Sequence, residues 1–171
     1  MSKEPIKTLA DAAVSVYMGN AGWMPQGLAE LTKEELLTRP SKGRSHLWWI
    51  VGHLATSSDI GPMMNGSASV IPEEYKKLFD METAPSDTGD GYPSMSELME
   101  VFKKALDNSC AAIKALSDEQ FNQKTGAELP EFLAQMSRFE LVVGFGAHIS
   151  YHIGQMVTIL RKLDKKPWPD M

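Results

Sequence analysis

The sequence predicts an all-α fold, a four-helix bundle formed by one domain over residues 1–171. Four long segments carry apolar residues at the spacing of amphipathic helices, and no stretch alternates apolar and polar residues over the length of a strand. With 171 residues, of which 43% are hydrophobic, the chain can bury one sizeable core. Residues 66–93 are rich in Gly, Ser, Pro and Asp, so we expect a long insertion between the second and third helices.

The first predicted helix spans residues 6–19, where apolar side chains recur with helical spacing, and it continues raggedly to residue 28. A short helical turn should follow at Thr32-Lys33-Glu34-Glu35, because Thr32 and Glu35 can form a capping box. This turn must end before Pro40, since proline does not continue a helix.

The second helix is predicted over residues 45–64, with Ser45 as its N-cap. Pro62 should bend this helix or end it early. Inside the 66–93 connection, residues 72–80 predict a short helix with a proline in its first turn.

The third and fourth helices are predicted in the C-terminal half. The third begins at Ser94 or Ser96 and follows one apolar stripe to Leu116, and a further helical turn starts at Ser117. The fourth begins at about residue 131 or residue 136 and ends at Leu163. Short connections between such helices are typical of a bundle.

Residues 141–160 contain no charged side chain and are long enough to span a bilayer. The middle of this stretch holds two histidines, a serine, a tyrosine and a glutamine, which are costly to place unpaired in hydrocarbon. We therefore expect a helix buried in a protein core and no membrane contact.

The composition excludes several partners. A formal net charge of -5 gives no basic field for a phosphate backbone, so nucleic acid is not expected. The single cysteine, Cys110, cannot close an intramolecular disulfide, and the first residues show no apolar run of an export signal. The expected location is the cytoplasm.

His148 and His152 are spaced i, i+4, so on a helix their side chains project from the same face. Their neighbours are apolar nearly all round the helix, so at least one of the two must lie in the interior. A buried imidazole needs a hydrogen-bond partner or a metal. The pair is therefore either two hydrogen-bonded core histidines or two ligands of one ion.

His53 favours the metal interpretation, because it lies in a similarly uncharged run in the second predicted helix. Three imidazoles suit zinc or nickel, and also iron, better than magnesium or calcium. They leave a coordination position open, which is typical of a catalytic site. His46 lies two turns earlier, too far along the helix for the same ion, and is expected at the surface or at the start of the helix.

Other polar residues near the three histidines are weaker candidates. Tyr151 and Gln155 lie at i+3 from His148 and His152, so they could orient a substrate or contact a ligand from behind. An ordinary packing role is equally compatible with their positions. Ser57 and Asp59 follow His53 on the same predicted helix and are given no catalytic role, so the general acid or base stays unknown.

Three motifs occur in order along the chain: Trp48-Trp49-Ile50-Val51-Gly52-His53-Leu54, then His148-x-x-x-His152-x-x-Gln155, and the closing Leu160-Arg161-Lys162-Leu163. With these motifs the chain resembles the DinB-like superfamily of metal-binding four-helix bundles. It implies that His53 is the ligand of the second helix and that His148 and His152 are the C-terminal pair. It also implies homodimers, and activities that include metal-dependent hydrolysis and thiol-dependent transfer with bacillithiol or mycothiol.

The leading hypothesis is a metal-dependent enzyme that acts on small molecules, either a hydrolase or a transferase that uses a low-molecular-weight thiol. The alternative is a non-catalytic metal-binding or interaction protein of the same fold, because no general base is evident beside the three histidines. A cavity next to the histidines, large enough for a substrate, would favour the enzyme.

Overall fold

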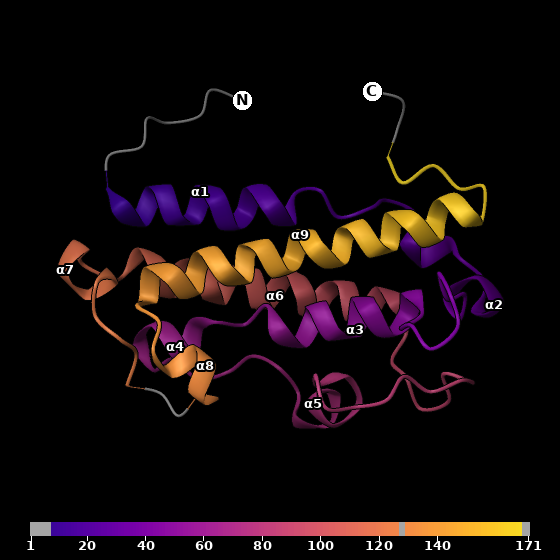
Figure 1. The fold of residues 1–171 in the computed structure, drawn as a ribbon, viewed down its shortest axis with the longest axis horizontal. Coiled ribbons are helices and arrows are strands. Elements are labelled where there is room, and N and C mark those ends of the chain that lie inside the picture. Colours follow the sequence, from indigo (N-terminus) through magenta and orange to yellow (C-terminus); the bar gives the residue numbers. More distant parts are fainter. Residues whose placement is uncertain (1–7, 127–128, 169–171) are drawn as a thin grey trace.

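The computed structural model describes residues 8–126 and 129–168. Its four long helices are α1 (Leu9–Ala21), α3 (Leu47–Ser57), α6 (Met95–Lys114) and α9 (Arg138–Lys162). Helix α1 packs against α6 and α9, and α3 packs against the same two helices, so the four close into a bundle (Figure 1). The predicted all-α four-helix bundle is confirmed, and no strand is assigned within the described residues.

Helix α1 begins at the N-cap Thr8, whose hydroxyl accepts from the backbone of Asp11 while the Asp11 carboxylate accepts from the backbone of Thr8. The start predicted at Ile6 lies outside the described residues. The predicted continuation to residue 28 is wrong, because the chain leaves the helix at Gly22. Pro25 disfavours helical backbone in the residue before it, and the next helical element is a 3₁₀ turn, η1 (Leu28–Glu30).

The predicted capping box of Thr32 and Glu35 is confirmed, and it starts the short helix α2 (Lys33–Leu36). Helix α3 follows, but its N-cap is His46 and not Ser45. The Nδ1 atom of His46 accepts from the backbone N–H of Trp49 at 3.1 Å, so Nε2 carries the proton and donates to the carbonyl of Ser86 at 2.9 Å. His46 therefore starts a helix, as one alternative expected, but it is fully buried and not at the surface.

The second helix ends early, as Pro62 predicted: α3 ends at Ser57 and a separate helix, α4 (Gly61–Asn65), follows, so the prediction of one continuous helix to residue 64 is wrong. A continuous helix would bring the ring of Pro62 against the carbonyl of Ser58, four residues earlier. In the structure that carbonyl accepts instead from the hydroxyls of Tyr17 at 2.5 Å and Ser109 at 2.9 Å. The break thus ties the end of α3 to α1 and α6.

The α3–α6 connection, residues 58–94, contains α4 and α5 (Glu73–Phe79), and α5 packs against α3. The predicted short helix near residues 72–80 is confirmed. Whether residues 66–93 are an insertion relative to the family stays a prediction. The ring of Phe79 is fully buried against Gly52, where a Cβ atom would lie only 2.4 Å from the ring. Gly52 therefore lets the end of α5 reach the backbone of α3.

We expect Gly52→Ala to lower the free energy of unfolding by about 1–3 kcal/mol, because overpacking outweighs the gain in helix propensity. Thermal unfolding measured against Gly19→Ala is the check, since a Cβ atom at Gly19 meets no atom within 4 Å. An unchanged or more stable Gly52→Ala would contradict the close packing of Phe79.

In the C-terminal half, α6 begins at the N-cap Ser94, so the first of the two predicted starts is confirmed. The helical turn predicted at Ser117 is confirmed as α7 (Asp118–Phe121), which a capping box of Ser117 and Gln120 starts. Both starts considered for the fourth helix correspond to real elements: α8 (Glu131–Ala134) is a separate turn, and α9 follows after the N-cap Ser137.

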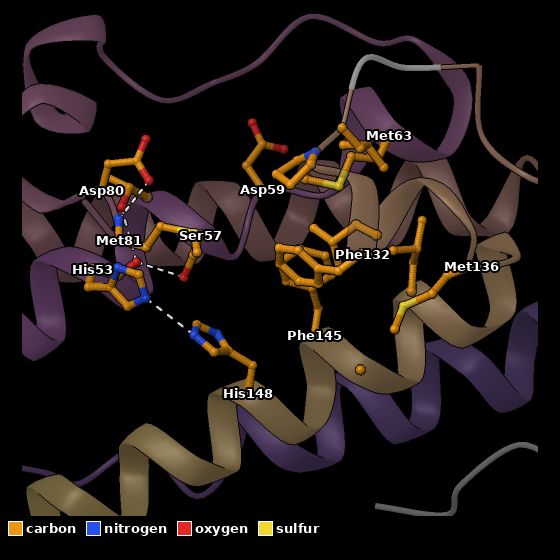
Figure 2. Close-up of a pocket in the computed structure, with 16 residues that line it drawn as sticks. His53, Ser57, Asp59, Met63, Asp80, Met81, Phe132, Met136, Phe145 and His148 are labelled. Atoms are coloured by element: carbon orange, nitrogen blue, oxygen red, sulfur yellow. Dashed lines mark hydrogen bonds between the residues drawn. The ribbon is translucent and has the colours of Figure 1, made fainter.

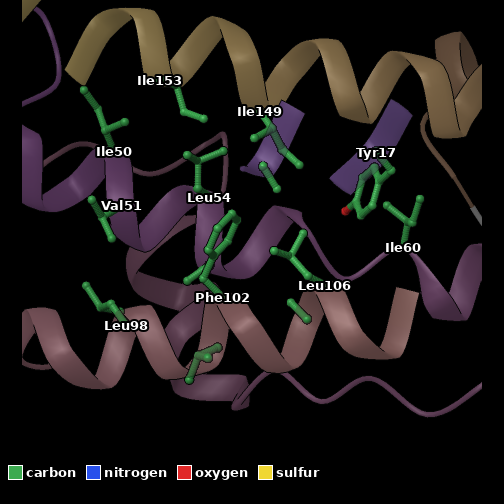
Figure 3. Close-up of a cluster of buried hydrophobic side chains, with 14 of the residues drawn as sticks. Tyr17, Ile50, Val51, Leu54, Ile60, Leu98, Phe102, Leu106, Ile149 and Ile153 are labelled. Atoms are coloured by element: carbon green, nitrogen blue, oxygen red, sulfur yellow. The ribbon is translucent and has the colours of Figure 1, made fainter. Parts of the chain in front are cut away.

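The core lies between the four long helices and is closed by side chains from each of them (Figure 3). The fully buried members labelled there include Tyr17, Leu54, Leu98 and Ile149. Over the described parts of the chain, none of the helices has both the length and the apolar character needed to traverse a bilayer. The uncharged run 141–160 thus belongs to α9, which packs on α1 and α3.

Candidate metal centre

The structure brings His53 of α3 together with His148 and His152 of α9. The Nε2 atom of His148 lies 3.2 Å from Nε2 of His53 and 3.0 Å from Nε2 of His152. One ring nitrogen from each residue lies within 4.8 Å of the other two. Residues that are 95 positions apart in the sequence therefore point one nitrogen each toward a common point.

The ring of His53 is held from two sides. Its Nδ1 donates to the backbone carbonyl of Phe79 at 2.8 Å, which fixes the proton on Nδ1 and leaves Nε2 as a lone pair. The indole of Trp49, one turn earlier on α3, stacks on the imidazole with ring centroids 4.9 Å apart and an interplanar angle of 5°. Because Phe79 reaches α3 only over Gly52, that glycine indirectly sets the orientation of His53.

His152 is fixed in a similar way by its own helix. Its Nδ1 donates to Oε1 of Gln155 at 2.8 Å, so its Nε2 is again an acceptor directed toward the cluster. Tyr151 points elsewhere: its ring packs edge-on against His152, but the side chain is 62% exposed. Of the two supporting residues considered from the sequence, Gln155 thus contacts a histidine of the cluster through a hydrogen bond.

His148 differs from the other two histidines. Its Nδ1 is buried and has no hydrogen-bond partner among the described residues. With the protons of His53 and His152 held on Nδ1, His148 can donate one Nε2 proton to only one of them. The Nε2 acceptor of the other ring is then left without a donor. With the proton of His148 on Nδ1 instead, lone pairs would oppose each other at both Nε2–Nε2 contacts, so either state is unfavourable in a partly buried place.

Burial also keeps these side chains neutral. It lowers the pKa of His148 to about 4 and that of His152 to about 4, with the neighbouring histidines as a further cause. The pKa of His53 is lowered mainly by burial as well, although the Phe79 carbonyl opposes the change. At neutral pH all three rings are therefore unprotonated bases, the form that binds a metal ion.

The residues present fit a divalent transition metal. Three imidazole nitrogens form a donor set that zinc, nickel and iron accept, and it contains no oxygen for a harder ion. Zinc–nitrogen bonds of about 2.0–2.1 Å place neighbouring ligands of a tetrahedral site about 3.3 Å apart, close to the two contacts observed here. A cation among the nitrogens would also remove the opposition of lone pairs.

A cavity of about 570 Å³ opens beside His53 and His148 (Figure 2). This volume is within the usual range for binding a small molecule. The histidine end carries polar side chains together with Met81, and apolar side chains gather at the other end, where Figure 2 labels Met63, Phe132, Met136 and Phe145. The cluster is thus open on one side to a space of substrate size.

The cavity also includes side chains to which no role was assigned from the sequence. Ser57 lines it, and its hydroxyl donates to the carbonyl of His53 at 2.7 Å. Asp59 lines it too, but its carboxylate already accepts from Asn108 at 2.8 Å and from Ser69 at 3.0 Å. Asp59 is thereby fixed as a structural acceptor.

Sequence reasoning missed three contributions. The Phe79 carbonyl, Asp80 and the short helix α8 all reach this site from parts of the chain that carry no recognisable motif. Asp80 directly follows α5 and lines both the main cavity and a smaller one of about 120 Å³, in each case with His53. The carboxylate of Asp80 reaches the cavity beside His53 only because α5 folds back along this side of the molecule.

The geometry defines a helical bundle with an interior three-histidine cluster beside a cavity. A sequence model of the DinB superfamily matches residues 24–156, which is more than half of the chain. The chain therefore belongs to the DinB superfamily.

Comparison with curated proteins finds no sequence match. Among solved structures, YfiT from Bacillus subtilis is similar with a TM-score of 0.66 and 17% sequence identity, over 97% of this chain and 94% of that one. It is described as a probable metal-dependent hydrolase with an unusual four-helix bundle topology. At this level of identity the comparison supports the fold.

Proposed function

We propose that the protein is a metal-dependent hydrolase of small molecules and that His53, His148 and His152 hold a divalent transition metal, with zinc or nickel favoured and iron next. The observation that carries the proposal is the convergence of three neutral Nε2 atoms at the wall of a substrate-sized cavity. The description of YfiT supports the same class of activity. When bound, such a metal supplies Lewis-acid chemistry that lowers the pKa of water or of a thiol.

The chain's own residues have distinct tasks in this reaction. Trp49, the Phe79 carbonyl and Gln155 hold the imidazoles in place. We assign to Asp80, a carboxylate that lines the cavity together with His53, the task of accepting the proton of the attacking water and returning it to the leaving group. In this way water adds to the carbonyl carbon of an ester or amide, and the bond to the leaving oxygen or nitrogen breaks.

Asp80→Asn tests the role of the carboxylate. We expect kcat to fall by about 10²-fold or more, because general acid–base catalysis contributes on that order. Metal content and melting temperature should stay unchanged, since Asn can still accept the hydrogen bond that Oδ1 receives from the backbone N–H of Met81. The matched control is Asp87→Asn, a carboxylate of the same connection that pairs with Arg39 away from the cavity. Unchanged kcat in Asp80→Asn would exclude Asp80 as the base.

The decisive experiment measures metal and activity on the same untagged protein. Elemental mass spectrometry should find about one zinc, nickel or iron per chain. A panel of 4-nitrophenyl esters should be hydrolysed faster by this protein than by its chelator-treated form. The absence of bound metal after reconstitution would overturn the proposal, and so would metal without hydrolysis.

Assays on the same samples distinguish the alternative functions. A transferase would consume a low-molecular-weight thiol, for example cysteine with 1-chloro-2,4-dinitrobenzene, in a metal-dependent manner. Cys110 does not supply that thiol, because burial raises its pKa and it does not line the cavity. A non-catalytic metal-binding protein would show metal but neither activity. The cavity beside the cluster favours an enzyme over this second class.

We further propose that the protein acts as a homodimer in the cytoplasm, with a small molecule as its substrate and no nucleic acid or membrane partner. Exposed apolar residues on one face of α9, Val143 and Tyr151, support a contact between two copies. We expect Tyr151→Glu to convert the dimer to a monomer in sedimentation velocity. Val70→Glu, at an exposed apolar residue of the α3–α6 connection, should leave it intact. A monomeric wild-type protein would contradict the proposal.

A further inference from the structure

The face of α9 that carries the histidines continues directly into the cavity. Leu141, Gly144, Phe145 and His148 line the cavity at the i, i+3, i+4, i+7 spacing of one helical face, and His152 follows four residues later. Gly144 lies on this face four residues, or about one turn, before His148.

Gly144 has no packing reason to be a glycine. It lies inside α9, and a Cβ atom built there would meet nothing within 4 Å. Gly146 differs, because a Cβ atom there would lie 3.0 Å from the side chain of Asn20. Gly19 and Gly154 are equally open glycines inside helices, and Gly144 differs from them because it lines the cavity, where its missing side chain leaves room for a ligand close to His148.

The far end of the cavity shows the chemistry of that group. Phe132 and Met136 lie opposite Phe145 at this end, and Phe132 is 60% exposed although it is aromatic (Figure 2). These side chains offer apolar contact and no hydrogen-bond partner for a polar group. A ligand that fills this end therefore presents a hydrocarbon surface to it.

The charged side chains of the cavity wall further restrict the class of ligand that can bind. Among the described residues the lining contains two carboxylates, Asp59 and Asp80, and neither lysine nor arginine. At the apolar end, away from the histidines, a carboxylate or phosphate on the ligand would lose its hydration and gain no cationic partner among these side chains. This end of the cavity therefore disfavours an anionic group.

We propose that the cavity binds the uncharged apolar part of the substrate, an alkyl or aryl group, with the reacting bond at the histidine end and with Gly144 providing the room for it. This inference rests on the proposed function for the reaction itself. Binding of the apolar part depends on the cavity alone, so it can be tested without catalysis.

The test is calorimetric titration of the full-length protein with two matched probes, 4-butylphenol and 4-butylbenzoate, which differ mainly in charge. The titration is made on the protein after removal of metal, so that no bound cation at the histidines attracts the carboxylate of the benzoate. We expect the phenol to bind at least about tenfold more tightly than the benzoate, a difference of about 1.4 kcal/mol. Equal binding of the two probes, or no binding of the phenol, would overturn the proposal.

Gly144→Leu should weaken binding of 4-butylphenol by about tenfold or more, because its side chain enters the cavity, and it should preserve or raise the melting temperature. Gly154→Leu is the matched control on the same helix, where a Cβ atom also meets nothing within 4 Å and which does not line the cavity. Unchanged binding in Gly144→Leu would contradict the inference.

A second variant keeps the test valid if Gly144→Leu does not fold. Phe132→Ala removes an exposed ring from the cavity wall and should weaken 4-butylphenol severalfold without unfolding the protein. Metal content measured on the same samples before the metal is removed separates the two proposals. If the protein binds 4-butylphenol but holds no metal, the proposal of a metal-dependent hydrolase is overturned. If it holds metal but does not bind 4-butylphenol, the proposed class of substrate is overturned.

Discussion

His148→Ala is expected to reduce bound metal from about one ion per chain to below about a tenth, and to lower ester hydrolysis by about 10³-fold or more. His148 is the histidine whose Nε2 lies within 3.2 Å of one partner and 3.0 Å of the other, so its removal leaves two donors on separate helices. Elemental mass spectrometry and initial rates on the same preparation are the measurements. The fold should persist, because Nδ1 of His148 makes no hydrogen bond within the described residues.

The matched control is Tyr151→Phe, three residues further along α9. Its side chain is largely exposed and the ring contact with His152 is retained, so metal content should not change. Full metal content and activity in His148→Ala would show that the cluster is a set of core histidines and would exclude the metal centre.

Removing the metal with a chelator is expected to lower the melting temperature by about 10 °C. A ligand that binds only the folded chain at 1,000 times its Kd adds about 4 kcal/mol, and about 2–4 °C corresponds to 1 kcal/mol for a chain of this size. Removal also restores the short contact between lone pairs of the cluster. Differential scanning calorimetry with and without chelator gives the shift.

Treatment with the same chelator should leave the melting temperature of His53→Ala almost unchanged, since that variant has lost one of the three nitrogen donors. A melting temperature of the wild-type protein that does not respond to chelator, while metal is shown to leave, would contradict a contribution of the ion to stability.

The fold could be predicted well from the sequence because its signals are local. The capping box at Thr32 and the helical turn at Ser117 depend on residues about three positions apart, and the apolar stripes depend on one helical period. Pro62 likewise predicts an early end of the second helix, but the residue at which that helix ends could not be predicted. The carbonyl of Ser58, at the end of α3, accepts hydrogen bonds from Tyr17 and Ser109, which are distant in the sequence.

Part of the candidate site could likewise be predicted from the sequence, and part could not. The i, i+4 spacing of His148 and His152 and the uncharged surroundings of His53 were sufficient to expect the three rings together. The groups that hold and surround these rings could not be predicted from the sequence, because a backbone carbonyl such as that of Phe79 leaves no signature in a sequence. Asp80 is likewise an ordinary acidic residue until α5 folds against α3.

The separation of the histidines along the chain has a consequence for how the protein acquires metal. His53 is synthesised 95 residues before His148, so a nascent chain extended only through α6 offers the cell's metal pool only one of the three imidazoles of the cluster. One such donor binds weakly and without preference for geometry. Loading must therefore wait until α9 has docked, and the finished bundle, not the order of synthesis, selects which ion stays.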